Sequence, residues 1–320
     1  MKKESKIIIG IHGLGNKPPK NVLENWWKQS IIDGLRYNNF KVTDFDFVLI
    51  YWADILHPTP IEISVTNTSP EVISEVYSSE EYTERNKPLN YREKAFEYLE
   101  KYYNNFIINE VLTLKYPAIT EFFIHLHLRD LKTYYSTEPV FYCGKKSIAK
   151  DAIVDRFAKT INNYSGKKIF LIAHSMGSLI SHDAFLEQTT SIPIDSLVTI
   201  GSPLGQKYVI NKYNAEGKQN SINKFRVPEN ILKNWYNLSD LQDQVAINHE
   251  ISNLYQENSG KVKIIDQLVE NKFISGGVRN PHKAFGYLRT PEFSKIINEF
   301  LTEKSPGFFE QIRNYLRGKR

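Results

Sequence analysis

The segment Ala173–Gly177 (AHSMG) places a serine between the strand-like sequence KIFLI and the helix-like sequence SLISHDAFLE. A serine hydroxyl is a weak nucleophile unless it is exposed on a sharp turn where a histidine can take its proton. The pattern therefore predicts Ser175 as a nucleophile, with the amide of Met176 facing the charge that develops on the attacked oxygen. The alternative interpretation is an ordinary strand–helix turn in which the serine caps the helix.

A second motif, His12–Gly15 (HGLG), directly follows the apolar segment 6–11. Its glycines leave the backbone bare, so that the amide of Leu14 can face a substrate oxygen. A phosphate-binding loop is the alternative, but the G-K-[ST] and G-x-G-x-x-G patterns of such loops are absent here. His12 precedes the turn, so we expect it to be a structural hydrogen-bonding residue and not a base.

Strand-like and helix-like segments alternate along the chain and must position these two motifs. Short, apolar, β-branched segments predict buried strands at 6–11, 44–51, 168–173, 195–200, 231–238 and 262–268. Helical patterns lie between most of them, at 21–37, 148–164, 178–187 and 291–303. This alternation predicts an α/β fold with a mostly parallel central sheet and flanking helices.

The interval 55–144 interrupts this alternation, because a crossover between parallel strands needs only about a dozen residues. Its first part, 58–88, is rich in Ser, Thr, Glu and Pro and predicts a polar, weakly packed loop. Its second part, 91–142, is rich in Phe and Tyr at helical spacing and predicts a helical subdomain. We expect a single domain over 1–320, in which this insertion is a helical cap or lid over an apolar pocket.

Composition and charge narrow the classes of function. Apolar residues make up 41% of the chain and charged residues 24%, which is typical of a soluble globular protein. No apolar run approaches the roughly 20 residues of a membrane-spanning helix. The net charge of +5 is spread along the chain, so nucleic acid is not an expected partner. Cys143 is the single cysteine, which excludes an internal disulfide and a cysteine zinc site.

The first and last residues of the sequence indicate where in the cell the protein is expected and whether it contacts a membrane. The first residues, MKKESKIIIGIHGLG, contain an apolar stretch too short for a signal peptide, so we expect a cytoplasmic protein. The last residues, FFEQIRNYLRGKR, have aromatic and basic residues at helical spacing, a pattern compatible with peripheral membrane contact. A terminal helix docked on the core, followed by a solvated tail, is the simpler interpretation.

Taken together, the motifs resemble those of the α/β-hydrolase superfamily, in its lipase/esterase-like serine hydrolase branch. The shared segments are IHGLG at 11–15, YWAD at 51–54, LIAHSMGS at 171–178 and IGSP at 200–203. The resemblance covers 5–54 and 145–303, begins at the third strand of the family and leaves the insertion unmatched. It implies the α/β-hydrolase fold.

The resemblance also implies the chain order serine, then an acid after a late strand, then a histidine. It assigns the acid to Asp243, because the sequence DQVA resembles the Asp-x-Val-Pro signature of the family, with Asp240 as the alternative. It assigns the base to His282, in the loop GGVRNPHKAFGYL. His249 also lies beyond the acid, but it is too close to Asp243 in sequence to span acid and serine.

The implied activity is hydrolysis of a carboxylic ester through an acyl-enzyme, with no metal or organic cofactor and with a small-molecule or lipid ester as substrate. One alternative is a catalytically silent receptor or scaffold with the same fold. Another is a phospholipase or acyltransferase that uses the same triad on lipids. His125, His127 and His182 are expected to be packing residues, and Asp54 has no predicted chemical role.

Overall fold

The computed structural model describes residues 5–42, 44–63, 75–79, 129–187, 191–217, 224–243, 245–275 and 278–303. Its labelled helices are α1 (Lys20–Tyr37), α2 (Ala53–Leu56), α6 (Ala149–Asn162), α7 (Met176–Leu186), α8 (Lys207–Ala215), α9 (Ala284–Tyr287), α10 (Pro291–Thr302) and the 3₁₀ helices η1 (Pro203–Gly205) and η2 (Ile251–Leu254). Its strands are β1 (Lys6–Ile11), β2 (Phe47–Ile50), β3 (Pro139–Tyr142), β4 (Lys145–Ile148), β5 (Lys168–His174), β6 (Ile194–Ile200), β7 (Phe225–Arg226), β8 (Ile231–Ser239), β9 (Tyr255–Gln256), β10 (Ile264–Leu268), β11 (Ile274–Ser275) and β12 (Val278–Arg279).

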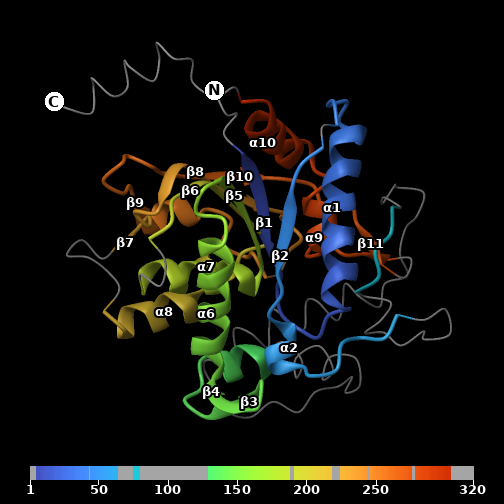
Figure 1. The fold of residues 1–320 in the computed structure, drawn as a ribbon. Helices are drawn as coiled ribbons and strands as arrows, with labels where there is room; N and C mark the ends of the chain where they lie inside the picture. The colour runs from blue at the N-terminus through green and yellow to red at the C-terminus, as the bar shows by residue number, and fades with distance from the viewer. Residues whose placement is uncertain are drawn as a thin grey trace, which may run out of the picture.

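A six-stranded parallel sheet forms the centre of the fold, with strand order β10-β8-β6-β5-β1-β2. Helices α1, α9 and α10 cover one face of the sheet, and α6, α7 and α8 lie on the other (Figure 1). The protein therefore has an α/β architecture with a helical layer on each side of a parallel sheet.

Each face of the sheet has its own hydrophobic core, which explains why the strands are almost continuously apolar. In β1, the alternate residues Ile7, Ile9 and Ile11 pack into a core that includes residues of α6 and α7. Ile8 points the other way, into a core built with residues of α1 and α10. Successive side chains of a strand point to opposite faces, so a strand buried on both sides needs apolar residues at every position.

The strand order places the two sequence motifs side by side. The chain passes from β1 to the edge strand β2 and then returns to β5, on the other side of β1. The direction in which the chain adds strands to the sheet thus reverses between β1 and β5. Ligands of open α/β sheets bind at such a switch point, beyond the carboxyl ends of the strands. His12–Gly15 follows the end of β1, and Ser175 follows the end of β5.

All six predicted strands and all four predicted helices are present, although β2 is shorter than its predicted range 44–51. One prediction is wrong: residues 139–142, assigned to the helical subdomain, form strand β3 of a hairpin with β4. Cys143 and Gly144 at its tip both have positive φ, 49° and 75°, as a two-residue hairpin turn of type I′ requires. Among the described residues, no helix is both long and apolar enough to cross a membrane.

The structure describes only parts of the insertion 55–144. Residues 75–79 fall within the predicted weakly packed loop, and here that prediction is wrong, because these residues pack against the domain. The Glu75 side chain is only 16% exposed, and the Tyr77 ring meets the edge of Phe285 at 5.3 Å. Phe122, Phe123, His125, His127 and the C-terminal segment FFEQIRNYLRGKR lie outside the described residues.

Candidate active site

Ser175 occupies a strained turn between β5 and α7. Its backbone has φ 54° and ψ −126°, which a residue with a side chain rarely adopts. The turn is held by the Ser175 amide, which donates to the carbonyl of Ile200 at 3.1 Å, and by Ser178, whose amide donates to the Ser175 carbonyl at 2.9 Å. A Cβ on Gly177 would lie 2.6 Å from the carbonyl oxygen of Ile11, so this position admits only glycine. The elbow predicted from AHSMG is present.

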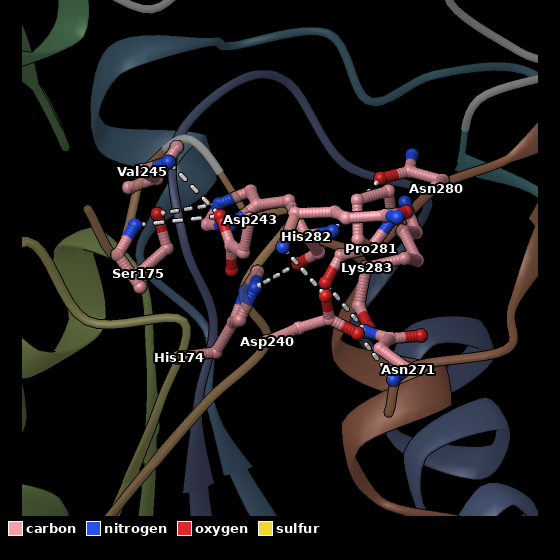
Figure 2. A network of polar contacts seen from close by, with 12 residues as sticks. His174, Ser175, Asp240, Asp243, Val245, Asn271, Asn280, Pro281, His282 and Lys283 are labelled. Atoms are coloured by element: carbon pink, nitrogen blue, oxygen red, sulfur yellow. Dashed lines mark hydrogen bonds and ion pairs between the residues drawn. The ribbon is translucent and has the colours of Figure 1, made fainter. Parts of the chain in front are cut away.

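The imidazole of His282 lies between the serine and a carboxylate (Figure 2). Its Nε2 is 3.0 Å from Oγ of Ser175, and its Nδ1 is 2.9 Å from each carboxylate oxygen of Asp243. Gly201, with φ 55°, lies beside this contact, and a Cβ there would be 2.8 Å from Oδ2 of Asp243. The structure thus brings together the serine, histidine and aspartate that the sequence singled out.

The carboxylate of Asp243 is buried and held by donors besides the histidine. The Tyr287 hydroxyl donates to Oδ2 at 2.6 Å, and the Val245 amide donates to Oδ1 at 2.9 Å. Burial, together with the charge of Asp243, raises the pKa of Tyr287 well above its usual value, so the tyrosine stays protonated as a donor. These contacts fix the carboxylate in the orientation that meets Nδ1 of His282.

Asp240, the alternative acid, is used elsewhere. Its Oδ2 accepts from the Asn271 amide at 2.6 Å and from Nη2 of Arg279 at 2.8 Å, and its Oδ1 accepts from the Gln242 amide at 2.7 Å. Its own amide donates to the Tyr287 hydroxyl at 3.0 Å. Asp240 therefore ties together the loops that carry Asp243 and His282, and Asp243 is the aspartate that faces His282.

His174 joins the site although sequence reasoning gave it no role. Its ring is buried, and Nε2 lies 2.8 Å from the backbone carbonyl of His282. A carbonyl oxygen only accepts, so Nε2 carries the proton and donates it. Burial lowers the pKa of His174 well below its usual value, and the charges of His282, Lys283 and Lys17 act in the same direction, so the ring stays neutral. The only sequence signal is its position directly before Ser175.

The loop His12–Gly15 lies directly on the elbow. A Cβ on Gly13 would be 2.7 Å from Cβ of Ser175, so the loop reaches the serine only because this position is glycine. The Leu14 amide donates to no acceptor among the described residues. The Met176 amide is the first of helix α7 and so has no acceptor within the helix. Both amides are therefore available to an oxygen bound at Ser175.

His12 is a structural residue, as its place before the turn predicts. Its Nε2 accepts from the Trp52 amide at 3.0 Å, so the proton is on Nδ1, which donates to the Gly13 carbonyl at 2.8 Å. Burial lowers the pKa of His12 to about 3, and the charge of Lys17 adds to this effect. The neutral ring fixes the loop backbone just before Leu14.

Asp130, from the last part of the insertion, supports the same loop and was not predicted. Its side chain is 2% exposed, and its Oδ2 accepts from the Gly15 amide at 2.8 Å. The His57 ring contacts the same carboxylate at 2.9 Å. No local sequence pattern marks this contact, because Asp130 and Gly15 are far apart in the chain.

The other candidate residues lie apart from this site. Nε2 of His182 is 3.0 Å from the hydroxyl of Tyr255, in the core below α7. Asp54 pairs with Arg156 of α6, which also donates to the Tyr51 carbonyl at 2.6 Å. Within the described ranges, no three His, Cys, Asp or Glu side chains gather into a group that could hold a metal ion.

No protein-family model matches the chain, and no curated protein matches it either. A solved structure of an uncharacterized protein from Bacillus cereus ATCC 10987 is similar at 11% identity with a TM-score of 0.29. That alignment covers 95% of this chain and 62% of the other.

Proposed function

We propose that this protein is a serine hydrolase of the α/β-hydrolase kind, which cleaves a carboxylic ester through an acyl-enzyme intermediate. One observation carries the proposal: a hydrogen-bonded chain runs from Oγ of Ser175 through the ring of His282 to the carboxylate of Asp243, with contacts of 3.0 and 2.9 Å. The serine of this chain sits on a strained turn between a strand and a helix, which is the position of the nucleophile in the α/β-hydrolase fold.

The placement of these residues supports the α/β-hydrolase assignment. Ser175 follows β5, Asp243 follows β8 and His282 follows β10, so the chain order is serine, acid, histidine. The serine and the HGLG loop both lie at the switch point of a parallel sheet. A receptor that only binds a ligand has no need of a strained serine in contact with a carboxylate-bound histidine.

In the first half of the reaction, Oγ of Ser175 attacks the ester carbonyl carbon while Nε2 of His282 takes the hydroxyl proton. The resulting imidazolium is stabilised by Asp243, which remains ionised. The amides of Leu14 and Met176 donate to the oxyanion of the tetrahedral intermediate. Collapse of this intermediate breaks the ester C–O bond, and the alcohol leaves with the proton returned by His282.

In the second half, a water molecule attacks the acyl-serine carbonyl. Nε2 of His282 takes a proton from that water and then gives it to Oγ of Ser175 as the acyl–oxygen bond breaks. The products are the carboxylic acid and the regenerated serine. Asp243, held by Tyr287 and the Val245 amide, keeps the histidine in the tautomer with Nε2 unprotonated.

A fluorophosphonate probe, which forms a covalent bond with activated serines, tests the proposal. The wild-type protein should be labelled at Ser175, and labelling should disappear in Ser175→Ala. The matched control is Ser165→Ala, which removes an exposed hydroxyl in the turn after α6 and should be labelled like the wild type. An unlabelled wild type would favour the silent receptor, and labelling that survives in Ser175→Ala would place the nucleophile elsewhere.

The alternative activity is that of a phospholipase or acyltransferase, which would use the same three residues on a lipid substrate. Turnover of a short soluble ester should be compared with turnover of phospholipid vesicles at equal acyl concentration. Preference for the soluble ester supports an esterase, and activity confined to vesicles identifies the lipid-acting alternative.

A further inference from the structure

A largely shielded ion cluster lies beside the proposed active site, and one of its members comes from the insertion. Oε1 of Glu75 is 3.1 Å from Nζ of Lys17, and Oε2 of Glu75 is 2.9 Å from Nζ of Lys283. The exposed fractions of the three side chains are 16% for Glu75, 9% for Lys17 and 11% for Lys283. One carboxylate therefore bridges two ammonium groups that are largely shielded from water.

Each lysine belongs to a loop that carries part of the proposed machinery. Nζ of Lys17 also donates to the backbone carbonyl of Leu14 at 2.5 Å, so it holds the residue whose amide faces the oxyanion. Lys283 directly follows the base His282, and its carbonyl accepts from Nδ2 of Asn271 at 2.9 Å. Glu75 thus connects the oxyanion loop to the loop of the base.

The charges explain why this bridge needs a carboxylate. Burial acts to raise the pKa of Glu75, but the charges of Lys17 and Lys283 outweigh it and lower the pKa to about 2. Burial lowers the pKa of Lys283, and the charge of Glu75 opposes that shift. Without the carboxylate, two ammonium groups would face each other in a shielded place, and their repulsion would push the two loops apart.

We propose that Glu75 is a positioning residue of the hydrolase: by bridging Lys17 and Lys283, it holds the Leu14 amide and His282 in register around Ser175. This inference rests on the proposed function, since it assigns a role within the same site. It also gives the insertion a part in catalysis that is separate from any role in substrate choice. The active site is then complete only when the Glu75 carboxylate bridges Lys17 and Lys283.

The rest of segment 75–79 provides a matched control, because it is anchored independently of Glu75. The Tyr77 hydroxyl donates to the carboxylate of Asp33 on α1, and the guanidinium of Arg289 lies 4.8 Å from the Tyr77 ring. Arg289 also donates to the Ser78 carbonyl. Tyr77→Phe therefore removes the hydroxyl contact with Asp33, keeps the ring against Phe285, and leaves the ion pairs of Lys17 and Lys283 with Glu75 unchanged.

The experiment compares wild type, Glu75→Gln and Tyr77→Phe, with Lys283→Met as a second variant of the bridge. The first measurement is the rate of fluorophosphonate labelling as a function of probe concentration. We expect Glu75→Gln and Lys283→Met to lower the maximal labelling rate about tenfold or more, with little change in the half-saturating concentration, because misplaced groups slow the reaction step. Tyr77→Phe should be labelled at a rate within about twofold of the wild-type rate, because the hydrogen bond that it loses, to Asp33, does not involve either loop.

The second measurement does not depend on activity. Hydrogen–deuterium exchange of peptides covering 12–17 and 280–285 should become faster in Glu75→Gln and stay at the wild-type rate in Tyr77→Phe. Wild-type labelling and exchange rates in Glu75→Gln, or equal losses in Glu75→Gln and Tyr77→Phe, would overturn the positioning role. A wild type that is never labelled would overturn the proposed function instead, and the exchange comparison would still decide whether Glu75 holds the two loops.

Discussion

His174 holds the backbone of His282 while leaving both nitrogens of the His282 ring free for Ser175 and Asp243. Nε2 of His174 donates to the carbonyl of His282 at 2.8 Å, and the two rings lie 4.8 Å apart at an angle of 37°. The residue before the nucleophile therefore contacts the residue that is proposed to activate it. The end of strand β5 in this way contacts both residues between which the first proton transfer is proposed.

This contact gives the first prediction. His174→Phe keeps a ring but removes the donor, so the His282 carbonyl loses its partner and the base loop loses a restraint. We expect the labelling rate to fall about tenfold, since the loss of one such hydrogen bond is worth about 1.4 kcal/mol in the activation barrier. His174→Gln, which can still donate, should retain more of the rate. Equal rates in all three proteins would show that the contact does not serve catalysis.

The second prediction separates the two aspartates. Asp243→Asn should leave the fold intact but lower the acylation rate by roughly 10⁴-fold, because the histidine loses the partner that sets its tautomer. Asp240→Asn should mainly lower the free energy of unfolding, by roughly 3 kcal/mol, because Arg279 loses its buried partner. Single-turnover kinetics and urea unfolding measure the two effects. If they were exchanged between the variants, Asp240 would be the functional acid.

The third prediction concerns stability and pH. The pKa of His12 is lowered to about 3 and that of His174 well below its usual value, both chiefly by burial. At a pH between the pKa of a histidine in the folded protein and its value of about 6.5 in the unfolded chain, the unfolded chain binds more protons than the folded protein. The free energy of unfolding therefore falls as the pH falls below about 6.5. Each ring contributes up to about 1.4 kcal/mol per pH unit in that range.

Urea unfolding at pH 7, 6 and 5 checks this prediction, with His174→Gln as the comparison. The variant should lose less stability than wild type between pH 7 and 5, because one of the two neutral rings is gone. Parallel curves for the two proteins would mean that His174 takes up its proton equally in the folded and unfolded states.

The fourth prediction concerns the insertion as a lid that sets substrate choice. Deleting 58–88 would also remove Glu75 and its ion cluster, so the sharper test is to replace Phe122 and Phe123 by serine. If aromatic residues of the cap cover the acyl chain, turnover of long-chain esters should fall strongly while a short ester is hydrolysed nearly as before. Equal losses on both esters, with an unchanged circular dichroism spectrum, would show that this pair does not select the acyl chain.

The elements of the sheet could be predicted because their sequence patterns are local. The run KIIIGI predicts a strand buried on both faces, and it forms β1 between β2 and β5. The β3–β4 hairpin could not be separated from the aromatic pattern around it, because the decisive feature is the positive φ of Cys143 and Gly144. Backbone conformation at a turn depends on what the flanking strands pack against.

Ser175, Asp243 and His282 could be predicted as site residues because sequence motifs mark them. The residues that hold the site loops in position could not be predicted. His174, Asp130 and Glu75 act through contacts with His282, Gly15 and the Lys17–Lys283 pair, all distant in the sequence. Such contacts arise only once the sheet brings its carboxyl ends together. For Asp243 and Asp240 the sequence left two alternatives, and the surrounding donors distinguish them.

The central claim is that Ser175 becomes acylated during ester hydrolysis. The most direct measurement is to mix the protein with p-nitrophenyl acetate, quench in acid within the first turnovers and locate the acetyl group by peptide mass spectrometry. The account predicts a burst of p-nitrophenol matched by acetylation of the peptide that contains Ser175, and neither signal in Ser175→Ala. Ester hydrolysis without acetylated Ser175, or an equal burst in Ser175→Ala, would contradict it.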